Sequence, residues 1–376
     1  MASKYCSDAL VVGAGPAGLG VALGLARSGI KVVVLDLQDK LGSVRRGETI
    51  RYDKDMDALL GPGFFDKQVI RQISKRTYFS HSGKCRVNRT IKNPNNIINW
   101  PDFIQSMAAV VESAGVKIWT GSAVTGFIEN NGAICGLKAI VSGFAEEELL
   151  AKAVFSCGGW DDPASRYLNI DRTHMDMHVH KQLVRDYTGP ADRLEYHFNL
   201  DNGGGLTIGT IFPRSETEAE IILLNAVKGT GSPTSFAGFS EEHPLFKKRT
   251  EGVSPFYTLN TKIPMGGMLT SCSPKPGLVL AGDVMGHVQA RGGSGITTSF
   301  LIGYKAGEIG AKAIPAGDWT RKTSEQFETQ LRNSAHMRSL KKHNFIYSNL
   351  RTQIFGKIKT PEDMDKYWQF LKLALR

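Results

Sequence analysis

The chain has 376 residues, of which 41% are hydrophobic and 22% are charged. This composition is typical of a soluble globular protein and excludes a collagen, a disordered chain and a polytopic membrane protein. The length predicts two or three domains rather than a lone binding module. The formal net charge is +10, but residues 330–376 hold ten Lys or Arg against three Asp or Glu. Because most of the excess is local and no motif accompanies it, we expect no nucleic-acid partner.

Two features bear on the compartment. The five cysteines are odd in number and widely spaced, with no C-x-x-C pair, which favours a reducing cytoplasm and predicts neither a disulfide framework nor a metal site. The longest uncharged stretch, residues 9–26, has the length of a short membrane span, yet it contains Pro16 and several glycines and follows Asp8. A signal peptide or a membrane anchor is therefore not expected.

The first 36 residues have the pattern of a β-α-β unit. Residues 10–12 and 31–35 are apolar runs that predict buried strands. Residues 16–27 are mostly small and predict a helix that ends at Gly29.

A glycine fingerprint occupies the turn from the first strand into this helix. Gly13, Gly15 and Gly18 form G-x-G-x-x-G, and Asp36 ends the second strand. The first glycine permits a tight turn, the second lets a pyrophosphate approach the helix N-terminus, and the third lets helix and strand pack closely, while the acid can bind the adenosine ribose. The pattern predicts dinucleotide binding rather than a glycine-rich turn alone, and it serves FAD and NAD alike. The candidate residues are Gly13, Gly15, Pro16, Ala17, Gly18 and Asp36.

A second glycine cluster follows an apolar run toward the other end of the chain. Residues 277–281 predict a strand that leads into Gly282-Asp283, and Gly286-His287 follows. Further glycines then open a helix over about residues 296–313. The candidate residues of this cluster are Gly282, Asp283, Gly292, Gly293, Ser294, Gly295 and Ile296.

Together the two clusters resemble the FAD-dependent oxidoreductases with the p-hydroxybenzoate hydroxylase fold. The resemblance implies that Asp283 binds the ribityl chain of FAD. It also places the N-terminus of the second helix beside the pyrimidine edge of the flavin, where backbone N–H groups would stabilise the charge of reduced flavin. A nicotinamide dehydrogenase with the same first fingerprint is the competing interpretation.

Within that superfamily the chain is most similar to the geranylgeranyl reductase group and related membrane-associated flavin dehydrogenases. The matching segments are residues 263–267, 282–283, 286–287 and 303–308, Arg46-Gly47-Glu48, and residues 162–166 after Cys157-Gly158-Gly159. The resemblance implies further cofactor contacts at Arg46, Gly47, Val124 and Gly159.

The chain also departs from that group. The Tyr-x-Trp-x-Phe-Pro motif of the reductases falls on residues 208–213, where only Phe212-Pro213 remains, and the Trp-x-Trp-x-Ile-Pro motif of the flavin-dependent halogenases is missing there too. No cysteine stands beside Gly47-Glu48, where the archaeal lipid reductases have one. The Asn-Pro-Leu segment before the flavin glycines is replaced by residues 289–291.

Three residues are candidates for catalytic roles. Arg291 would bring a permanent cation to the flavin or clamp an anionic substrate group, unless it is a surface residue of a loop. His287 could act as a general acid, with a structural histidine as the alternative. Phe212 could shape the pocket over the flavin, or simply end a strand.

The expected fold class is α/β, with a discontinuous Rossmann-type FAD domain, a sheet-based substrate domain and C-terminal helices. The FAD domain is predicted over residues 1–60, 98–165 and 270–318, and the substrate domain over residues 61–97 and 166–269. Residues 319–376 form a basic helical region, which either caps the protein or lies on an anionic membrane.

The predicted function is an FAD-dependent oxidoreductase that exchanges a hydride between flavin and a small hydrophobic or aromatic substrate, by carbon–carbon double-bond reduction or by dehydrogenation. The alternative is an aromatic monooxygenase that uses NADPH and oxygen. A halogenase and an electron-transfer flavoprotein without turnover are less favoured. No second G-x-G-x-x-G with strand and helix flanks occurs, which argues against a separate Rossmann domain for NADPH. NADPH itself is not excluded, and ferredoxin and quinone stay open as electron donors. The protein is expected in the cytoplasm, with possible peripheral membrane contact.

Overall fold

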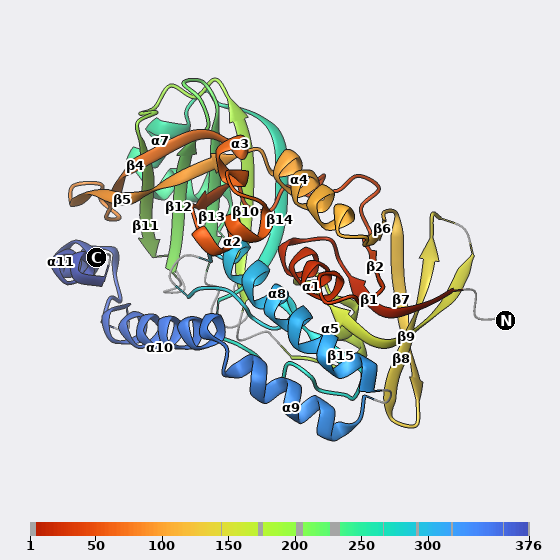
Figure 1. Cartoon of the computed structure of the whole chain (residues 1–376). Coiled ribbons are helices and arrows are strands. Elements are labelled where there is room, and N and C mark those ends of the chain that lie inside the picture. Colours follow the sequence, from red (N-terminus) through yellow and green to blue (C-terminus); the bar gives the residue numbers. More distant parts are fainter. Residues whose placement is uncertain are drawn as a thin grey trace.

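The computed structural model describes residues 5–143, 145–171, 176–200, 206–225, 234–265, 267–290, 293–316, 319–355 and 357–374. Two sheets lie side by side, with helices packed between and below them (Figure 1). The predicted α/β class, with two sheet-based parts and helices at the C-terminus, is confirmed.

The first sheet has the strand order β6-β2-β1-β9-β8-β7, and β15 also pairs with β9. Its parallel strands are β1 (Tyr5–Val12), β2 (Val32–Leu35), β6 (Lys117–Trp119), β9 (Glu146–Ser156) and β15 (Leu278–Leu280). The strands β7 (Ser122–Asn130) and β8 (Ala133–Val141) form an antiparallel hairpin on one side. The second half of β1, residues 9–12, and all of β2 are buried, as expected for parallel strands covered on both faces.

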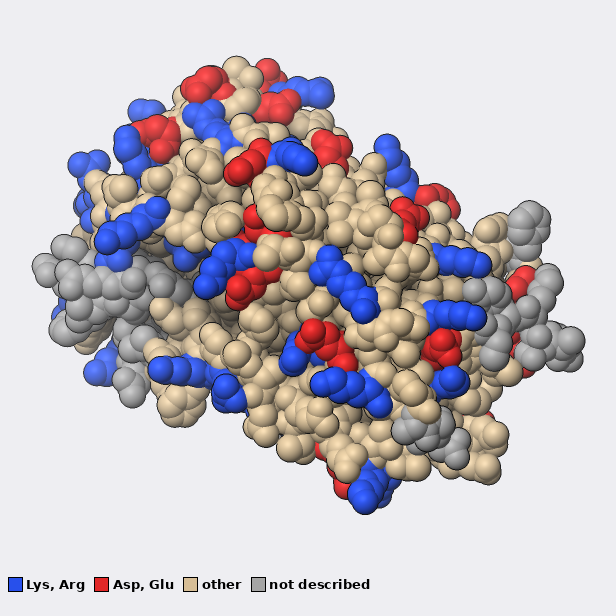
Figure 2. Space-filling view, viewed as in Figure 1, with Lys and Arg blue, Asp and Glu red and all other residues tan. Residues whose placement is uncertain are grey.

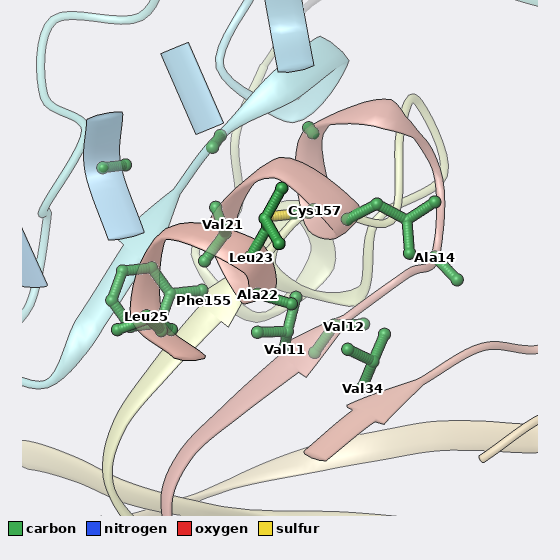
Figure 3. Close-up of a cluster of buried hydrophobic side chains, with 14 of the residues drawn as sticks. Val11, Val12, Ala14, Val21, Ala22, Leu23, Leu25, Val34, Phe155 and Cys157 are labelled. Atoms are coloured by element: carbon green, nitrogen blue, oxygen red, sulfur yellow. The ribbon is translucent and has the colours of Figure 1, made fainter. Parts of the chain in front are cut away.

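The helix α1 (Pro16–Ala26) packs against α8 (Ile296–Ala313) and α4 (Trp100–Ser113). Apolar side chains on α1, among them Leu23 and Leu25, meet Val11 and Phe155 of the sheet in the core of the molecule (Figure 3). The predicted β-α-β unit is therefore present, and its helix is buried along nearly its whole length.

Four glycines permit the close contact between α1 and α8. A Cβ atom at Gly20 or Gly24 would overlap a backbone carbonyl oxygen of α8, and a Cβ atom at Gly303 or Gly307 would overlap a backbone carbonyl oxygen of α1. Each pair is spaced i, i+4, so it lies on one face of its helix. The two backbones therefore approach as closely as they do only because these positions carry no side chain.

The second sheet has the order β14-β10-β13-β12-β11-β4-β5-β3. Its strands are β3 (Thr49–Arg51), β4 (Val69–Phe79), β5 (Arg86–Ile98), β10 (Asp176–Arg185), β11 (Arg193–Leu200), β12 (Leu206–Pro213), β13 (Ala219–Asn225) and β14 (Ser254–Pro264). The short helices α6 (Phe236–Glu242) and α7 (Pro244–Thr250) cover one face, where Phe239 and Phe246 pack on Ile211 and Leu223. The helices α2 (Lys54–Leu60), α3 (Phe64–Gln68) and α5 (Pro163–Tyr167) fill connections.

The C-terminal region is helical, as predicted, with α9 (Arg321–Arg332), α10 (Ala335–Phe355) and α11 (Pro361–Ala374). Met337 and Leu340 of α10 join the main core, whereas Phe345 is 71% exposed. Trp368 of α11 packs on Phe198 of the second sheet. No helix in the described part of the chain is long and apolar enough to cross a membrane.

The domain boundaries stay a prediction. The strands β4 and β5 belong to the second sheet, but so does β3, which lies inside the range 1–60 predicted for the FAD domain. On the face shown in Figure 2, Lys and Arg are spread among Asp and Glu and do not merge into one patch.

The glycine contact between α1 and α8 predicts that a glycine-to-alanine substitution destabilises the protein more at this contact than at an uncrowded glycine. Gly24→Ala should lower the free energy of unfolding by about 1–3 kcal/mol, because the new methyl group forces the two backbones apart. Gly126→Ala on β7 is the matched control, since its Cβ atom would lie 3.9 Å from the Lys138 side chain. Urea unfolding of both variants measures the difference, and equal stabilities would contradict the packing argument.

Candidate functional site

The turn that precedes α1 has the geometry of a phosphate-binding loop. Gly13 has φ +90°, and a Cβ atom there would lie 2.7 Å from the Cys157 carbonyl oxygen. A Cβ atom on Gly18 would overlap the Gly13 carbonyl oxygen. These two glycines are therefore required by the protein's own backbone, as the fingerprint predicts for a tight turn and for close packing.

Gly15 differs from both of its neighbours in the fingerprint. It is the N-cap of α1, no side chain in the described residues caps this helix, and a Cβ atom on Gly15 would meet no atom within 4 Å. Free N–H groups and the positive end of the helix dipole thus face open space, which is what a pyrophosphate requires. The residues present fit the diphosphate of FAD.

Asp36 is buried beside this turn. One carboxylate oxygen accepts a hydrogen bond from the Ala14 amide at 2.6 Å, and the other accepts one from the Gln38 amide at 2.9 Å. The acid therefore ties the phosphate turn to the end of β2, a contact that the motif alone did not indicate. Each oxygen keeps a further lone pair, so the predicted ribose contact stays a prediction.

The second glycine cluster lies against the first turn of α1. Gly282 has φ +84°, and a Cβ atom on it would lie 2.7 Å from the Ala17 Cβ atom. Asp283 is half-buried, and its Oδ1 atom is 3.6 Å from the place that a Cβ atom on Gly295 would take. The structure therefore brings together the two clusters that the sequence keeps far apart.

His287 is fully buried below the Gly282-Asp283 turn. Its Nδ1 atom accepts a hydrogen bond from the Gly282 amide at 3.1 Å, and Nε2 has no hydrogen-bond partner within the described residues. Burial lowers the pKa of His287 to about 3, so its ring is neutral at pH 7. The role of general acid stays a prediction, and this geometry favours the structural alternative.

The start of α8 faces the loop that contains Arg46 and Gly47. Gly295 is the N-cap of α8, and a Cβ atom on Gly47 would lie 3.5 Å from the Ile296 Cδ1 atom. A Cβ atom on Gly293 would lie 2.5 Å from the Ile263 Cδ1 atom of β14. Arg291 and Gly292 lie outside the described residues, so their predicted roles stay predictions.

Sequence reasoning missed a residue that supports this loop. Asn344 on α10 accepts a hydrogen bond from the Ala290 amide at 2.8 Å and donates one to the Val288 carbonyl oxygen at 2.9 Å. Nothing in the local sequence marks this asparagine, because its partners lie more than fifty residues away.

The remaining candidates are in different settings. Val124 is half-buried on β7, and Gly159 follows β9 with φ +84° and open space at its Cβ position. Phe212 lies on β12, where its ring centroid is 5.5 Å from that of Tyr196, and it packs near Leu194. Their contacts to cofactor or substrate stay predictions. Cys157 is buried, which raises its thiol pKa, so it packs rather than reacts.

A group of charged side chains, most of them buried, lies around the loop at residues 45–48. Arg45 Nε is 2.5 Å from Glu48 Oε1, and Arg214 pairs with the other oxygen of Glu48. Lys181 Nζ is 2.6 Å from Glu220 Oε1 and 4.0 Å from Glu48 Oε1. Of these residues only Glu48 was part of a sequence motif.

Comparison with known proteins agrees with this geometry. The family described as "FAD binding domain" matches residues 6–240, so the chain belongs to that family. The digeranylgeranylglycerophospholipid reductase of Methanocella arvoryzae is 27% identical over 349 residues, which cover 89% of this chain and 84% of that protein. The enzyme of the same name from Methanocaldococcus jannaschii is 25% identical over 365 residues, covering 95% of this chain and 88% of that protein.

Solved structures show the same fold. A geranylgeranyl bacteriochlorophyll reductase-like protein of Thermoplasma acidophilum superposes with a TM-score of 0.80 at 17% identity, covering 96% of this chain and 90% of that one. The myxobacterial chondrochloren halogenase superposes with a TM-score of 0.70 at 14% identity, covering 92% and 83%.

The fold and the two glycine clusters that it brings together thus define a flavoprotein oxidoreductase with FAD as its cofactor. Within that class the chain resembles the archaeal digeranylgeranylglycerophospholipid reductases over most of its length. The prediction of FAD over a nicotinamide cofactor is confirmed.

The open space at Gly15 predicts a substitution that separates binding from folding. Gly15→Ala should leave the melting temperature of the FAD-free protein unchanged, because φ is −76° and the methyl group meets no atom. It should raise the Kd for FAD by about tenfold or more, because the methyl group takes space that the diphosphate needs. Flavin fluorescence titration measures the Kd. Gly18→Ala is the contrasting variant and should lose stability as well, so an identical response of the two variants would contradict this assignment.

The buried His287 predicts a pH effect on stability. Its folded pKa of about 3 is lower than the ordinary value of 6.5, so below pH 6.5 the unfolded chain binds a proton that the folded protein does not. The free energy of unfolding should therefore fall by about 1.4 kcal/mol per pH unit from this group as the pH drops toward 3. In His287→Asn, which keeps an acceptor for the Gly282 amide, urea unfolding between about pH 7 and pH 5 should show a slope shallower by about one proton. Parallel pH profiles of variant and parent would show that His287 titrates normally.

Proposed function

We propose that this protein uses reduced FAD to hydrogenate carbon–carbon double bonds in the isoprenoid chains of a lipid. The observation that carries the proposal is the apolar surround of the flavin glycines. Ile263 and Met265 are the nearest side chains to the Cβ position of Gly293, and a buried cluster of Met177, Met265 and Val288 continues from there. The half-buried Ile263 and Leu224 pack on this cluster and present an apolar surface that can desolvate an alkene chain without leaving polar groups unpaired.

The relatives support the same substrate class. Both archaeal proteins described above are named digeranylgeranylglycerophospholipid reductases. Each match covers most of this chain and most of the relative. The bound FAD would supply the hydride, and the protein would supply binding, orientation and a water-excluding surface. Phe212, which contacts Tyr196 on the second sheet, is the proposed shaping residue of the pocket.

A lipid substrate fits a peripheral contact with a membrane. On α10, Phe345 and Ile346 are exposed at 71% and 42%, and Lys341 and Lys342 precede them by one turn. Apolar side chains flanked by cations are typical of helices that lie on anionic bilayers. Because Met337 and Leu340 of the same helix are buried, α10 would cap the core with its first turns and meet the membrane with later ones.

The function is tested with anaerobic, FAD-loaded protein that has been reduced by dithionite. A phospholipid with geranylgeranyl chains should reoxidise the flavin, and mass spectrometry should show two added hydrogens per reduced double bond. The same lipid with saturated chains is the control and should leave the flavin reduced. A product that gains oxygen only in air, with NADPH as donor, would identify the aromatic monooxygenase instead. No reoxidation by either route would refute the proposal.

A further inference from the structure

Charged side chains gather where the loop of residues 45–48 meets the second sheet, and three of them are buried. The side chains of Glu48 and Lys181 are 0% exposed, and that of Glu220 is 2% exposed. Arg45 and Arg214 complete the group through their ion pairs with Glu48. Removing a charge from water costs several kcal/mol unless pairing offsets it, so five charges at one contact call for a reason beyond packing.

Lys181 is the member that joins the two parts of the protein. It extends from the middle of β10, pairs with Glu220 of the neighbouring β13, and donates a hydrogen bond to the Arg46 carbonyl oxygen at 3.3 Å. The Arg46 side chain in turn donates to Thr261 Oγ1 of β14 at 2.5 Å. Two adjacent strands of the second sheet thus hold this loop, one by its backbone and one by its side chain.

The loop held in this way adjoins the place of the flavin. Gly47 follows Arg46 directly, and the nearest atom to its Cβ position belongs to Ile296, the first residue of α8. On the other side, the residue nearest to the Cβ position of Gly293 is Ile263, two residues after Thr261 on β14. A shift of the Lys181 ammonium would therefore move the loop against the helix N-terminus that faces the flavin.

The group also carries unbalanced charge. Arg45, Arg214 and Lys181 are cations, and Glu48 and Glu220 are the two carboxylates. Burial lowers the pKa of both guanidinium groups, and the charge of Glu220 is the largest influence that opposes this effect. Arginine stays protonated in proteins, so one positive charge is in excess within these five residues, while Glu218 and Asp102 act on the guanidinium groups less strongly than Glu220 does. In a site shielded from water, such a charge favours the negative, reduced form of a flavin.

We propose that Lys181 is a positioning residue for FAD. It clamps the Arg46–Gly47 backbone to the second sheet, and the charge group around it, balanced by Glu220, raises the reduction potential of the flavin. The two effects separate in variants because one depends on the Lys181 contact and the other on net charge. The proposal concerns the cofactor and is independent of the substrate.

Three variants of the full chain test it. Lys181→Met removes the contact and one positive charge. Glu220→Gln removes one negative charge and keeps the contact with Arg46. The double variant removes the contact and keeps the net charge. We expect the Kd for FAD to rise by about tenfold in both variants that lack Lys181, and by less than about threefold in Glu220→Gln. The midpoint potential should fall in Lys181→Met, rise in Glu220→Gln and stay near that of the parent in the double variant.

The controls exclude a purely structural effect. Lys152→Met breaks an ion pair with Asp8 on the first sheet, 3.0 Å long and half-exposed, and should change neither the Kd nor the potential. Lys181→Arg, which keeps a positive charge, should retain most of the FAD affinity of the parent protein. If Lys181→Met fails to fold, the charge-balanced double variant supplies the Kd and Glu220→Gln supplies the potential. An unchanged Kd in folded variants without Lys181 overturns the positioning role, and an unchanged potential in Glu220→Gln overturns the role of the charge.

Discussion

The close contact between α1 and α8 is the constraint on which the site depends. Gly20 and Gly24 of one helix face Gly303 and Gly307 of the other across a distance that leaves no room for a methyl group. Each helix begins with a glycine at its N-cap, Gly15 in α1 and Gly295 in α8. Glycine within a helix costs about 0.5–1 kcal/mol relative to alanine, and here the glycines fix the position of one helix N-terminus relative to the other.

The two sides of the cofactor site are held by opposite means. On the helix side the backbone is fixed by the absence of side chains, at Gly13, Gly18 and Gly282. On the sheet side the loop at Arg46 and Gly47 is held by Lys181, which reaches it from β10, and by the Arg46 side chain, which reaches Thr261 on β14. A glycine contact has one close-packed geometry, whereas an ion-pair network can adjust to a change in charge. The helix side therefore suits a constant diphosphate, and the loop side suits a flavin that changes charge during turnover.

The sequence predicted the parts whose signal is local. The spacing of Gly13, Gly15 and Gly18 between a strand and a helix identified the phosphate turn, because the motif and its context lie within a few residues of each other. The likeness of the Gly282-Asp283 segment to a known family supplied the second half of the site. That the two halves meet was expected only through that family likeness, because no local pattern specifies the contact between α1 and α8.

The parts that could not be predicted depend on strand register and distant contacts. Lys181 and Glu220 look like ordinary charges of half-exposed strands in the sequence, and only the pairing of β10 with β13 buries them together. The pairing of β3 with β5 likewise placed residues 49–51 in the second sheet. The burial of His287 follows from the turn that folds over it, which a lone histidine in a sequence does not reveal.

Strand register also explains how one face of the second sheet carries both the buried charges and the apolar cluster. Along β10, the residues Met177, Val179 and Lys181 alternate onto a single face, and on β13 the residues Glu220 and Leu224 share that face. Lys181 lies in the middle of β10, under the Arg46 loop, and the apolar side chains lie toward the beginning of that strand, beside Gly293. Because the strands are antiparallel, Glu220 near the start of β13 lies close to Lys181, and the beginning of β10 meets the end of β13. A shift of β10 by one residue would turn its polar neighbouring residues onto this face in place of the charged and the apolar side chains. The pairing of β10 with β13 therefore fixes the loop contact and the hydrophobic surface together.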